Sequence, residues 1–320
     1  MSLIDPLGRR FRSLRVSLTA ACNYACDYCV PAGSVLKPSP NALDGADLMR
    51  LVGLLDRVLD LKKIRLTGGE PLIAPNLSAV LAGLRAHQSE ISLTTNGQFL
   101  GRHVEALKAA GCKRINVSLD SMDPVVFKTM AKAGDLESVL SGIEAALAVG
   151  MKVKLNTVPM RTQNRDQVVP LFDWCSQRGI ELRFIELMRM GHLQDVAAFD
   201  REFVPQAELV ELLAVFGEAE QLPREANSTS QTWVNARGRF GFISNESAPF
   251  CGDCDRLRLT SDGMLYGCIS SSNALDIRPA LTLDEPEAIA LIVDRLGRAL
   301  KDKQPVRFSG EQTIMQILGG

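Results

Sequence analysis

The sequence contains little histidine and few aromatic residues. Among its 320 residues there are 3 histidines, and aromatic residues make up 5% of the chain. So few histidines leave little material for mixed Cys/His zinc sites or for histidine-based catalytic triads. So few aromatic side chains make a poor platform for stacking bases. With 36 Lys+Arg against 37 Asp+Glu, the net charge of −1 also argues against a nucleic-acid partner.

Long apolar runs and one common nucleotide-binding motif are also absent from the sequence. No run approaches the roughly 18 apolar residues that a membrane span needs, and the N-terminus lacks the apolar core of a signal peptide. No Gly-Lys dipeptide occurs, which excludes a P-loop, so a nucleoside triphosphate would have to be held by scattered Arg and Lys side chains. We therefore expect a soluble, cytoplasmic protein without a membrane partner.

Short apolar or β-branched runs alternate with longer amphipathic stretches through the first part of the chain. Strands are expected at 14–19, 63–67, 91–95, 114–119, 153–158 and 182–186, and helices at 46–59, 76–87, 101–110, 136–149 and 166–178. A strand followed by a helix, repeated about six times, predicts parallel pairing through right-handed crossovers. The predicted fold class is α/β, with a partial (β/α)6 barrel over residues 1–190. Its active site should lie at the carboxyl ends of the strands.

The pattern changes after about residue 190. Residues 191–201 are expected to form a loop, 205–215 a short helix, 231–234 and 240–244 strands, and 286–301 a final helix. Residues 191–320 are therefore expected to form a smaller C-terminal region.

The eight cysteines give the sharpest chemical signal. Six fall into two tight groups, whereas Cys112 and Cys175 stand alone and are expected to be ordinary buried thiols. In a reducing compartment, grouped thiols favour metal binding over disulfides. The first group, Cys22, Cys26 and Cys29, directly follows the first expected strand. Three thiolates on a cubane iron–sulfur cluster leave one iron open, as a catalytic metal site requires. Structural zinc and buried apolar thiols are the alternatives.

The second group, Cys251, Cys254 and Cys268, repeats the count of three thiols. A zinc site completed by His192 is one interpretation, and a second cluster with an open iron is the other. Arg256 and Arg258 alternate along an expected strand inside this group, so both guanidiniums should point to one side. Paired guanidiniums suit a polyphosphate, although a solvated strand face would show the same alternation.

Two motifs together carry a family resemblance. A Cys-x3-Cys-x2-Cys loop with Tyr28 before its last cysteine is followed, one expected strand later, by the sequence Thr-Gly-Gly-Glu-Pro at 67–71. This combination resembles the radical S-adenosylmethionine superfamily. The resemblance implies a [4Fe-4S] cluster whose open iron binds S-adenosylmethionine, which is cleaved to methionine and a 5′-deoxyadenosyl radical.

The resemblance narrows when the whole chain is considered. Segments 14–19, 64–71, 93–97, 114–120, 154–156 and 183–188, the second cysteine group and the terminal Gly319-Gly320 occur in an order similar to that of the GTP 3′,8-cyclase family. That family performs the first step of molybdenum cofactor (molybdopterin) biosynthesis, the conversion of GTP to (8S)-3′,8-cyclo-7,8-dihydroguanosine 5′-triphosphate. The resemblance implies a lyase that uses an external electron donor and delivers its product to the next enzyme of the pathway. The resemblance does not decide between a monomer and a homodimer.

The resemblance also implies the site residues. One [4Fe-4S] cluster would be held by Cys22, Cys26 and Cys29, and a second, which binds GTP, by Cys251, Cys254 and Cys268. The S-adenosylmethionine site would be lined by Tyr28, Gly69, Ser118 and Met188. GTP would be contacted by Arg15, Arg65, Thr94, Lys154, Arg256 and Arg258. The Gly-Gly tail would reach toward the active site.

Two segments depart from the family pattern. Ala20 and Ala21 stand where the family usually has Asp-Arg, and the segment around Ala74 lacks a commonly found arginine and aspartate. None of these positions is a cluster ligand, so we expect the chemistry to be retained. The alternatives are a two-cluster radical enzyme that modifies a peptide and a non-catalytic zinc-binding scaffold.

Overall fold

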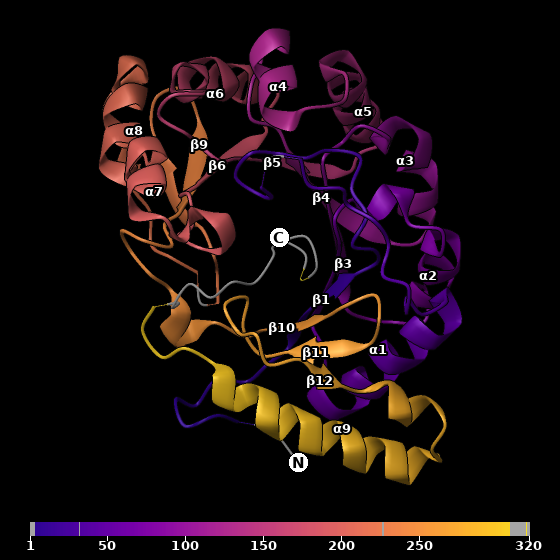
Figure 1. The fold of residues 1–320 in the computed structure, drawn as a ribbon. Helices are drawn as coiled ribbons and strands as arrows, with labels where there is room; N and C mark the ends of the chain where they lie inside the picture. Colours follow the sequence, from indigo (N-terminus) through magenta and orange to yellow (C-terminus); the bar gives the residue numbers. More distant parts are fainter. Residues whose placement is uncertain (1–3, 32, 226, 308–317, 319–320) are drawn as a thin grey trace.

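A single curved sheet with helices outside it forms the body of the protein (Figure 1). The computed structural model describes residues 4–31, 33–225, 227–307 and 318. Within these residues, twelve strands form one sheet in the order β12-β11-β10-β1-β2-β3-β4-β5-β6-β9-β8-β7. Strands β1 to β6 are consecutive parallel neighbours, which confirms the predicted partial (β/α)6 barrel.

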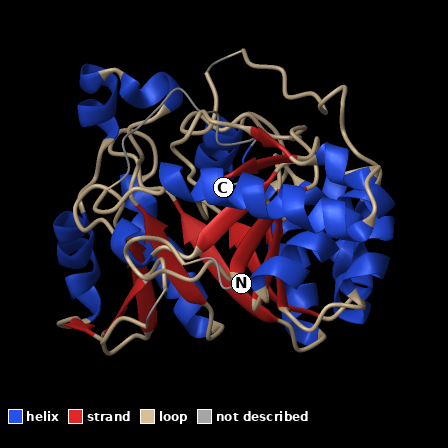
Figure 2. Cartoon of the chain, turned by 90° about the horizontal axis from the view of Figure 1, so that it is seen from below, coloured by secondary structure: helices blue, strands red, loops and turns tan. Residues whose placement is uncertain are grey.

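The barrel strands lie close to their predicted positions. They are β1 Ser13–Ser17, β2 Lys63–Thr67, β3 Glu90–Thr95, β4 Cys112–Ser118, β5 Lys152–Thr157 and β6 Glu181–Ile185. The helices between them are α1 Gly45–Leu59, α2 Leu77–Leu84, α3 Leu100–Ala109, α4 Pro124–Ala131, α5 Leu136–Ala148 and α6 Val168–Gln177. Seen from below, the strands lie inside and the helices cover their outer face (Figure 2).

Helix α1 illustrates why the amphipathic stretches fold onto the sheet. Its side-chain cap is Asp44, whose carboxylate accepts a 2.8 Å hydrogen bond from the Asp47 backbone N–H. The helix ends at Asp60, which adopts a left-handed conformation. Leucines and valines spaced three and four residues apart form its buried face, including Leu48, Leu51 and Leu55. Burial of each such side chain contributes about 1.5–3 kcal/mol, so packing rather than helix propensity holds α1 in place.

Residues after 190 extend the same sheet at both ends. Strand β9 (Arg239–Ile243) is parallel to β6, and β10 (Arg256–Leu259) is parallel to β1. The outer strands β7 Glu220–Gln221, β8 Gln231–Val234, β11 Met264–Tyr266 and β12 Leu275–Asp276 add antiparallel edges. Helix α9 (Glu285–Ala299) lies beside α1, where Arg57 forms an ion pair with Glu285. The division at residue 190 stays a prediction about domain organisation.

The structure differs from the sequence-based expectations in two places. Residues 191–201, expected to form a loop, contain the 3₁₀ turn Gly191–Gln194 and helix α7 (Val196–Glu202), which Asp195 caps through the Ala198 N–H. Helix α4, between β4 and β5, was not predicted, although Asp123 followed by Pro124 is a typical helix start. Helix α8 (Gln206–Leu213) lies within the predicted range 205–215. Among the described residues, no helix has the length and apolar character needed to cross a membrane.

Candidate active site

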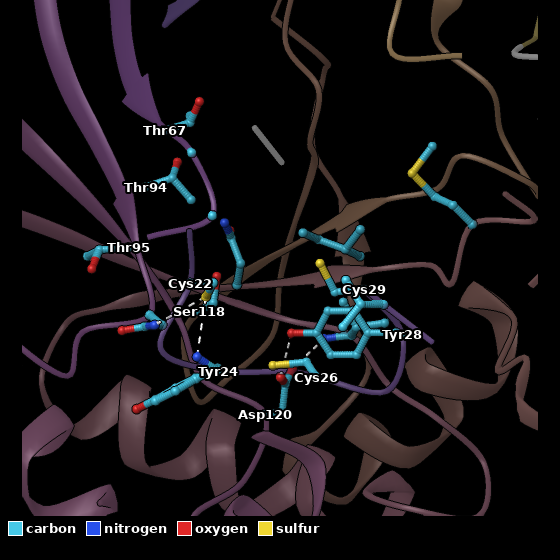
Figure 3. A pocket seen from close by; sticks show the side chains of 18 of the residues that line it. Cys22, Tyr24, Cys26, Tyr28, Cys29, Thr67, Thr94, Thr95, Ser118 and Asp120 are labelled. Carbon is cyan, nitrogen blue, oxygen red and sulfur yellow. Dashed lines mark hydrogen bonds between the residues drawn. The ribbon is translucent and has the colours of Figure 1, made fainter. Parts of the chain in front are cut away.

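The first cysteine loop lies at the carboxyl end of β1 and is tied to its surroundings by backbone hydrogen bonds. The Gly69 N–H donates to the Thr19 carbonyl at 2.7 Å, and the Glu70 N–H donates to the Ala21 carbonyl at 2.9 Å. The loop forms one side of a cavity of about 190 Å³, which Cys22, Cys26 and Cys29 line. Figure 3 shows the three sulfurs facing one common space.

The thiols of this loop are held in an environment that disfavours free thiolates. Burial raises the pKa of Cys22 to about 11 and that of Cys29 to about 12, and it raises the pKa of Cys26 as well. A bound metal reverses this balance, because a thiol that coordinates a cation releases its proton to solvent. Three thiols around one space fit a three-thiolate cluster. Among the described residues, no group of three or more His, Cys, Asp or Glu side chains is arranged to hold a single metal ion.

Tyr28 is fixed within the same loop by a buried carboxylate. Its hydroxyl donates a 2.8 Å hydrogen bond to Asp120 Oδ2, which lies just beyond the end of β4 (Figure 3). Asp120 Oδ1 accepts hydrogen bonds from the Val158 N–H at 2.8 Å and from the Thr157 hydroxyl at 3.2 Å. The cysteine loop is thereby tied to the ends of β4 and β5. Asp120 was not predicted as a site residue, although its position directly after a strand could have indicated one.

All four residues predicted to line S-adenosylmethionine lie around this first cavity. Tyr28 comes from the cysteine loop, Gly69 follows β2, Ser118 ends β4 and Met188 follows β6. They are separated by up to 160 positions in sequence and are brought together because the carboxyl ends of parallel strands meet at one edge of the barrel.

A second cavity of about 140 Å³ adjoins the first. It is lined by the second cysteine group, Cys251, Cys254 and Cys268. Four residues line both cavities: Thr94, Asn156, Ile185 and Met188. The two cysteine groups therefore face adjoining spaces inside the barrel rather than opposite sides of the molecule.

Three arginines, of which Arg258 is buried and Arg15 and Arg65 are half-buried, form a row along one side of the second cavity. Strand register places Arg15 of β1 directly beside Arg65 of β2 and Arg258 of β10. Desolvation, reinforced by repulsion between neighbouring arginines, lowers the pKa of Arg65 to about 9 and that of Arg258 to about 10, and it lowers the pKa of Arg15 well below its ordinary value. Like charges held side by side repel one another, so this row favours a multiply charged anion. Arg256 lines the same cavity, as strand alternation predicts.

The second cysteine group differs electrostatically from the first. Burial would raise the pKa of Cys254, but the charges of Arg256 and Lys303 outweigh it and lower the pKa to about 6. Burial and the neighbouring cysteines raise the pKa of Cys251 to about 11. The second centre therefore contains a thiol already poised as a thiolate, which suits a metal ligand.

Several other predicted residues lie elsewhere. Lys154 is not among the residues that line either cavity, and its ammonium pairs with Glu181 at 2.8 Å. The ring of His192 lies 2.7 Å from the Asp27 carbonyl, beside the first cysteine loop, so the interpretation in which it completes a zinc site at the second group is wrong. Cys112 and Cys175 are buried, as expected. Gly319 and Gly320 lie outside the described residues.

Two basic residues of the second cavity were not predicted. Arg183 lies on β6 two positions before Ile185, and strand alternation could have placed it in the cavity. Lys303 follows α9 and has no local sequence signal, because its place in the site depends on where the end of that helix packs.

Comparison with known proteins places the chain in a family. Residues 16–175 match the Radical SAM superfamily, and residues 180–308 match the family described as Molybdenum Cofactor Synthesis C. The chain is 39% identical over 298 residues to a GTP 3′,8-cyclase of Corynebacterium glutamicum, covering 87% of this chain and 78% of that protein. It is 38% identical over 346 residues to a GTP 3′,8-cyclase of Synechococcus sp., covering 99% and 98%.

The solved structures that resemble this chain share its fold. Streptococcus suis SuiB bound to its precursor peptide SuiA superposes with a TM-score of 0.63 at 16% identity, covering 83% of this chain and 62% of SuiB. Native anSMEcpe with bound AdoMet gives a TM-score of 0.55 at 14% identity, covering 91% and 83%. These comparisons support an enzyme rather than a zinc-binding scaffold, and they imply a [4Fe-4S] cluster and S-adenosylmethionine as cofactors. The chain belongs to the radical SAM superfamily and, within it, to the family of molybdenum cofactor enzymes whose curated members are named GTP 3′,8-cyclase.

Proposed function

We propose that the protein converts GTP to (8S)-3′,8-cyclo-7,8-dihydroguanosine 5′-triphosphate, with the first cavity holding S-adenosylmethionine and the second holding GTP. The observation that carries the proposal is the shared wall between the cavities, formed by Thr94, Asn156, Ile185 and Met188. A reaction between two bound molecules needs their reacting atoms within a few ångströms of each other. Adjoining cavities, each lined by three cysteines, support such an arrangement.

The first cavity is assigned to the radical-generating half of the reaction. Cys22, Cys26 and Cys29 would hold a [4Fe-4S] cluster, which when reduced supplies the electron that cleaves S-adenosylmethionine. Tyr28, Gly69, Ser118 and Met188 would surround the cosubstrate. Tyr28 is held by Asp120, and Gly69 packs directly against the backbone of the cysteine loop, so both positions are fixed before the cosubstrate binds. The electron would come from an external donor.

The second cavity is assigned to the substrate. Cys251, Cys254 and Cys268 would hold the second [4Fe-4S] cluster, beside which the guanine base would bind. The triphosphate would lie against the row of Arg15, Arg65 and Arg258 and against Arg256. Three neighbouring guanidiniums, which repel one another, gain most from an anion that offers several oxygens. Lys154 is predicted to approach the same phosphates once it leaves its pair with Glu181.

The remaining proposals concern the surroundings of the enzyme. We propose a cytoplasmic location, because the cysteines are unpaired and their metal-binding role needs a reducing compartment. The product would pass to the next enzyme of molybdenum cofactor biosynthesis. The Gly319-Gly320 tail is predicted to reach the active site. Leu318 supports this, because its backbone carbonyl accepts a 3.2 Å hydrogen bond from Arg258.

The division of labour between the two cysteine groups can be tested with paired variants. The protein is reconstituted anaerobically with iron and sulfide and incubated with GTP, S-adenosylmethionine and a reductant. Cys22→Ala should abolish formation of 5′-deoxyadenosine, because its cluster loses a thiolate ligand. Cys254→Ala should retain uncoupled formation of 5′-deoxyadenosine but yield no cyclised nucleotide. Cys175→Ala, at a buried lone thiol, is the matched control and should retain product formation.

Two results would contradict the proposed function. Formation of the cyclised nucleotide by Cys254→Ala would reject the second group as the substrate centre. Protein that takes up stoichiometric zinc and no iron would reject both centres. Two cubane clusters should instead give about eight irons per chain.

A further inference from the structure

The end of helix α9 packs directly onto the second cysteine group. Gly267, immediately before Cys268, has no side chain, and a Cβ at that position would overlap the Ala299 carbonyl at the end of α9. The turn Leu300–Asp302 continues the helix and presents the next residues to the cysteine loops. Asp302 accepts 3.1 Å hydrogen bonds from the Ser271 hydroxyl and from the Asn273 side-chain amide, just after Cys268. The helix end is therefore attached to the loop that carries the third cysteine.

Lys303, the next residue, points its ammonium at another cysteine of the same group. Its Nζ donates hydrogen bonds to Cys254 Sγ at 3.2 Å and to the Arg256 carbonyl at 2.9 Å. The Nζ also lies 5.3 Å from the centre of the Phe11 ring. Lys303 is 8% exposed, which is unusual for lysine because burial of an ammonium is costly without compensation. Of its two hydrogen-bond partners, the sulfur carries a negative charge when it serves as a metal ligand.

The N-terminal segment holds this arrangement from the other side. Arg9 Nη1 donates hydrogen bonds to the Cys251 carbonyl at 2.6 Å and to the Gln304 carbonyl at 3.1 Å. Arg9 is in turn fixed by Asp5, to which its Nε donates at 2.7 Å, in a pair whose side chains are 6% and 2% exposed. The Arg9 guanidinium thus joins Cys251 to Gln304, the residue that follows Lys303. The segment that carries Lys303 has little freedom to move away from Cys254.

We propose that Lys303 is a positioning residue of the second cysteine centre, placing a buried positive charge against the Cys254 sulfur and thereby setting the retention and the redox properties of the cluster held there. The inference rests on the proposed function, in which this group holds a cluster. A hydrogen bond to a ligand sulfur and a nearby positive charge both stabilise the reduced, more negative state of an iron–sulfur cluster. Groups that contact metal ligands from outside change metal affinity by about 10–100-fold.

The first cysteine group offers a contrast inside the same chain. The charged groups that influence Cys22 and Cys26 are carboxylates and other cysteines, including Glu70 and Asp120. Cys254 instead lies beside Arg256 and Lys303. Both residues line the second cavity, where Arg256 is assigned to substrate and both hydrogen bonds of Lys303 are made to the cysteine loop itself. The ammonium of Lys303 is therefore in direct contact with a sulfur of the second cysteine group.

The test uses a protein that carries Cys22→Ala, Cys26→Ala and Cys29→Ala together, so that only the second cluster can form. This triple variant is the background protein. Each protein is reconstituted anaerobically, and three quantities are measured: iron and sulfide per chain, the midpoint potential with the EPR spectrum of the reduced cluster, and the rate at which a chelator removes iron. Lys303→Met removes the charge and keeps an aliphatic chain. Lys303→Arg keeps the charge. Lys301→Met removes the same charge from an exposed position two residues earlier.

We expect Lys303→Met to shift the midpoint potential to a more negative value and to lose iron to the chelator about tenfold faster or more. Lys303→Arg should recover most of both properties, and Lys301→Met should match the background protein. If circular dichroism shows that Lys303→Met does not fold, Lys303→Gln decides the question with the same expected shift. An unchanged potential and stripping rate in the uncharged variants would overturn the proposal, as would Lys303→Arg behaving like Lys303→Met.

Failure of the proposed function gives a different result. If the background protein takes up no iron, Cys251, Cys254 and Cys268 do not hold a cluster, and both the second site and the role of Lys303 are rejected. If it takes up about four irons and Lys303→Met changes nothing, the second site stands and the inference about Lys303 alone is wrong.

Discussion

Gly69 should tolerate no side chain, because it lies against the backbone of the first cysteine loop. A Cβ added there would overlap the Ala21 carbonyl oxygen and come within 2.6 Å of the Ala21 carbonyl carbon and 2.8 Å of the Ala20 oxygen, whereas ordinary contacts begin at 3.4 Å. These neighbours are backbone atoms, which cannot rotate away as a flexible side chain would. In Gly69→Ala the cysteine loop must therefore move away from the end of β2 by about 1 Å.

The cost of this movement can be worked out from the contacts it disturbs. The Gly69 N–H donates to Thr19 at 2.7 Å and the Glu70 N–H donates to Ala21 at 2.9 Å, and both bonds join the two segments that must separate. Overpacking costs about 1–3 kcal/mol, and a weakened backbone hydrogen bond about 0.5–1.5 kcal/mol. We expect Gly69→Ala to lower the free energy of unfolding by about 3 kcal/mol, measured by urea denaturation of the metal-free protein.

The same substitution should also affect one cluster selectively. Because Cys22 directly follows the displaced segment, reconstituted Gly69→Ala should lose the iron of the first centre and keep that of the second. Gly297→Ala in α9 is the matched control, since no atom lies within 4 Å of its added Cβ and alanine favours a helix by about 0.5–1 kcal/mol. Equal unfolding free energies for Gly69→Ala and the parent, together with full iron content, would refute the reasoning.

Three further predictions concern the remaining site residues. Tyr28→Phe should lower the free energy of unfolding by about 1 kcal/mol, because it removes one hydrogen bond to Asp120. Asp120→Ala should lower it more, because the Asp120 carboxylate accepts two further hydrogen bonds. Equal losses for the two variants in urea denaturation would count against this network. Burial raises the pKa of Glu70 from 4.5 to about 7, so the folded state holds its proton more tightly than the unfolded state. Protonation of Glu70 should therefore contribute about 3 kcal/mol to the free energy of unfolding. This contribution should be complete below pH 4.5 and be lost as the pH rises through 7. Glu70→Gln should remove this slope from the unfolding free energy of the metal-free protein, and a slope that persists would show that another group causes it. Arg258→Ala should weaken GTP binding by about 1–3 kcal/mol in anaerobic calorimetry, with Arg258→Lys intermediate, and an unchanged Kd would exclude Arg258 from the phosphate site.

Much of the barrel could be predicted because its signals are local. Six strands and five of the helices between them follow from the spacing of apolar residues, which is a property of neighbouring positions along the chain. Helix α4 was missed because it is short and lies between two stronger signals. Residues 191–201 were assigned to a loop because their helix is only seven residues long.

The cysteine groups could likewise be found from the sequence, because the thiols proposed to hold each cluster include residues that lie close together along the chain. Cys22, Cys26 and Cys29 lie within eight positions, so the covalent chain alone brings their sulfurs near one another. The same holds for Cys251 and Cys254. The count of three thiols in each group predicted an open metal position before any contact between the groups was known.

Tertiary structure alone decided how these local units meet. Strand β10 could have joined either edge of the sheet, and only its pairing with β1 places Arg258 beside Arg15 and, beyond it, Arg65. Lys303 lies 49 positions from the cysteine it contacts, and Arg9 lies 242 positions from Cys251. Such contacts depend on the packing of whole helices and strands, which no short window of sequence encodes. The chain thus determined its own cysteine loops and barrel repeat, whereas the folded sheet determined that the two loops face adjoining cavities and which charges surround them.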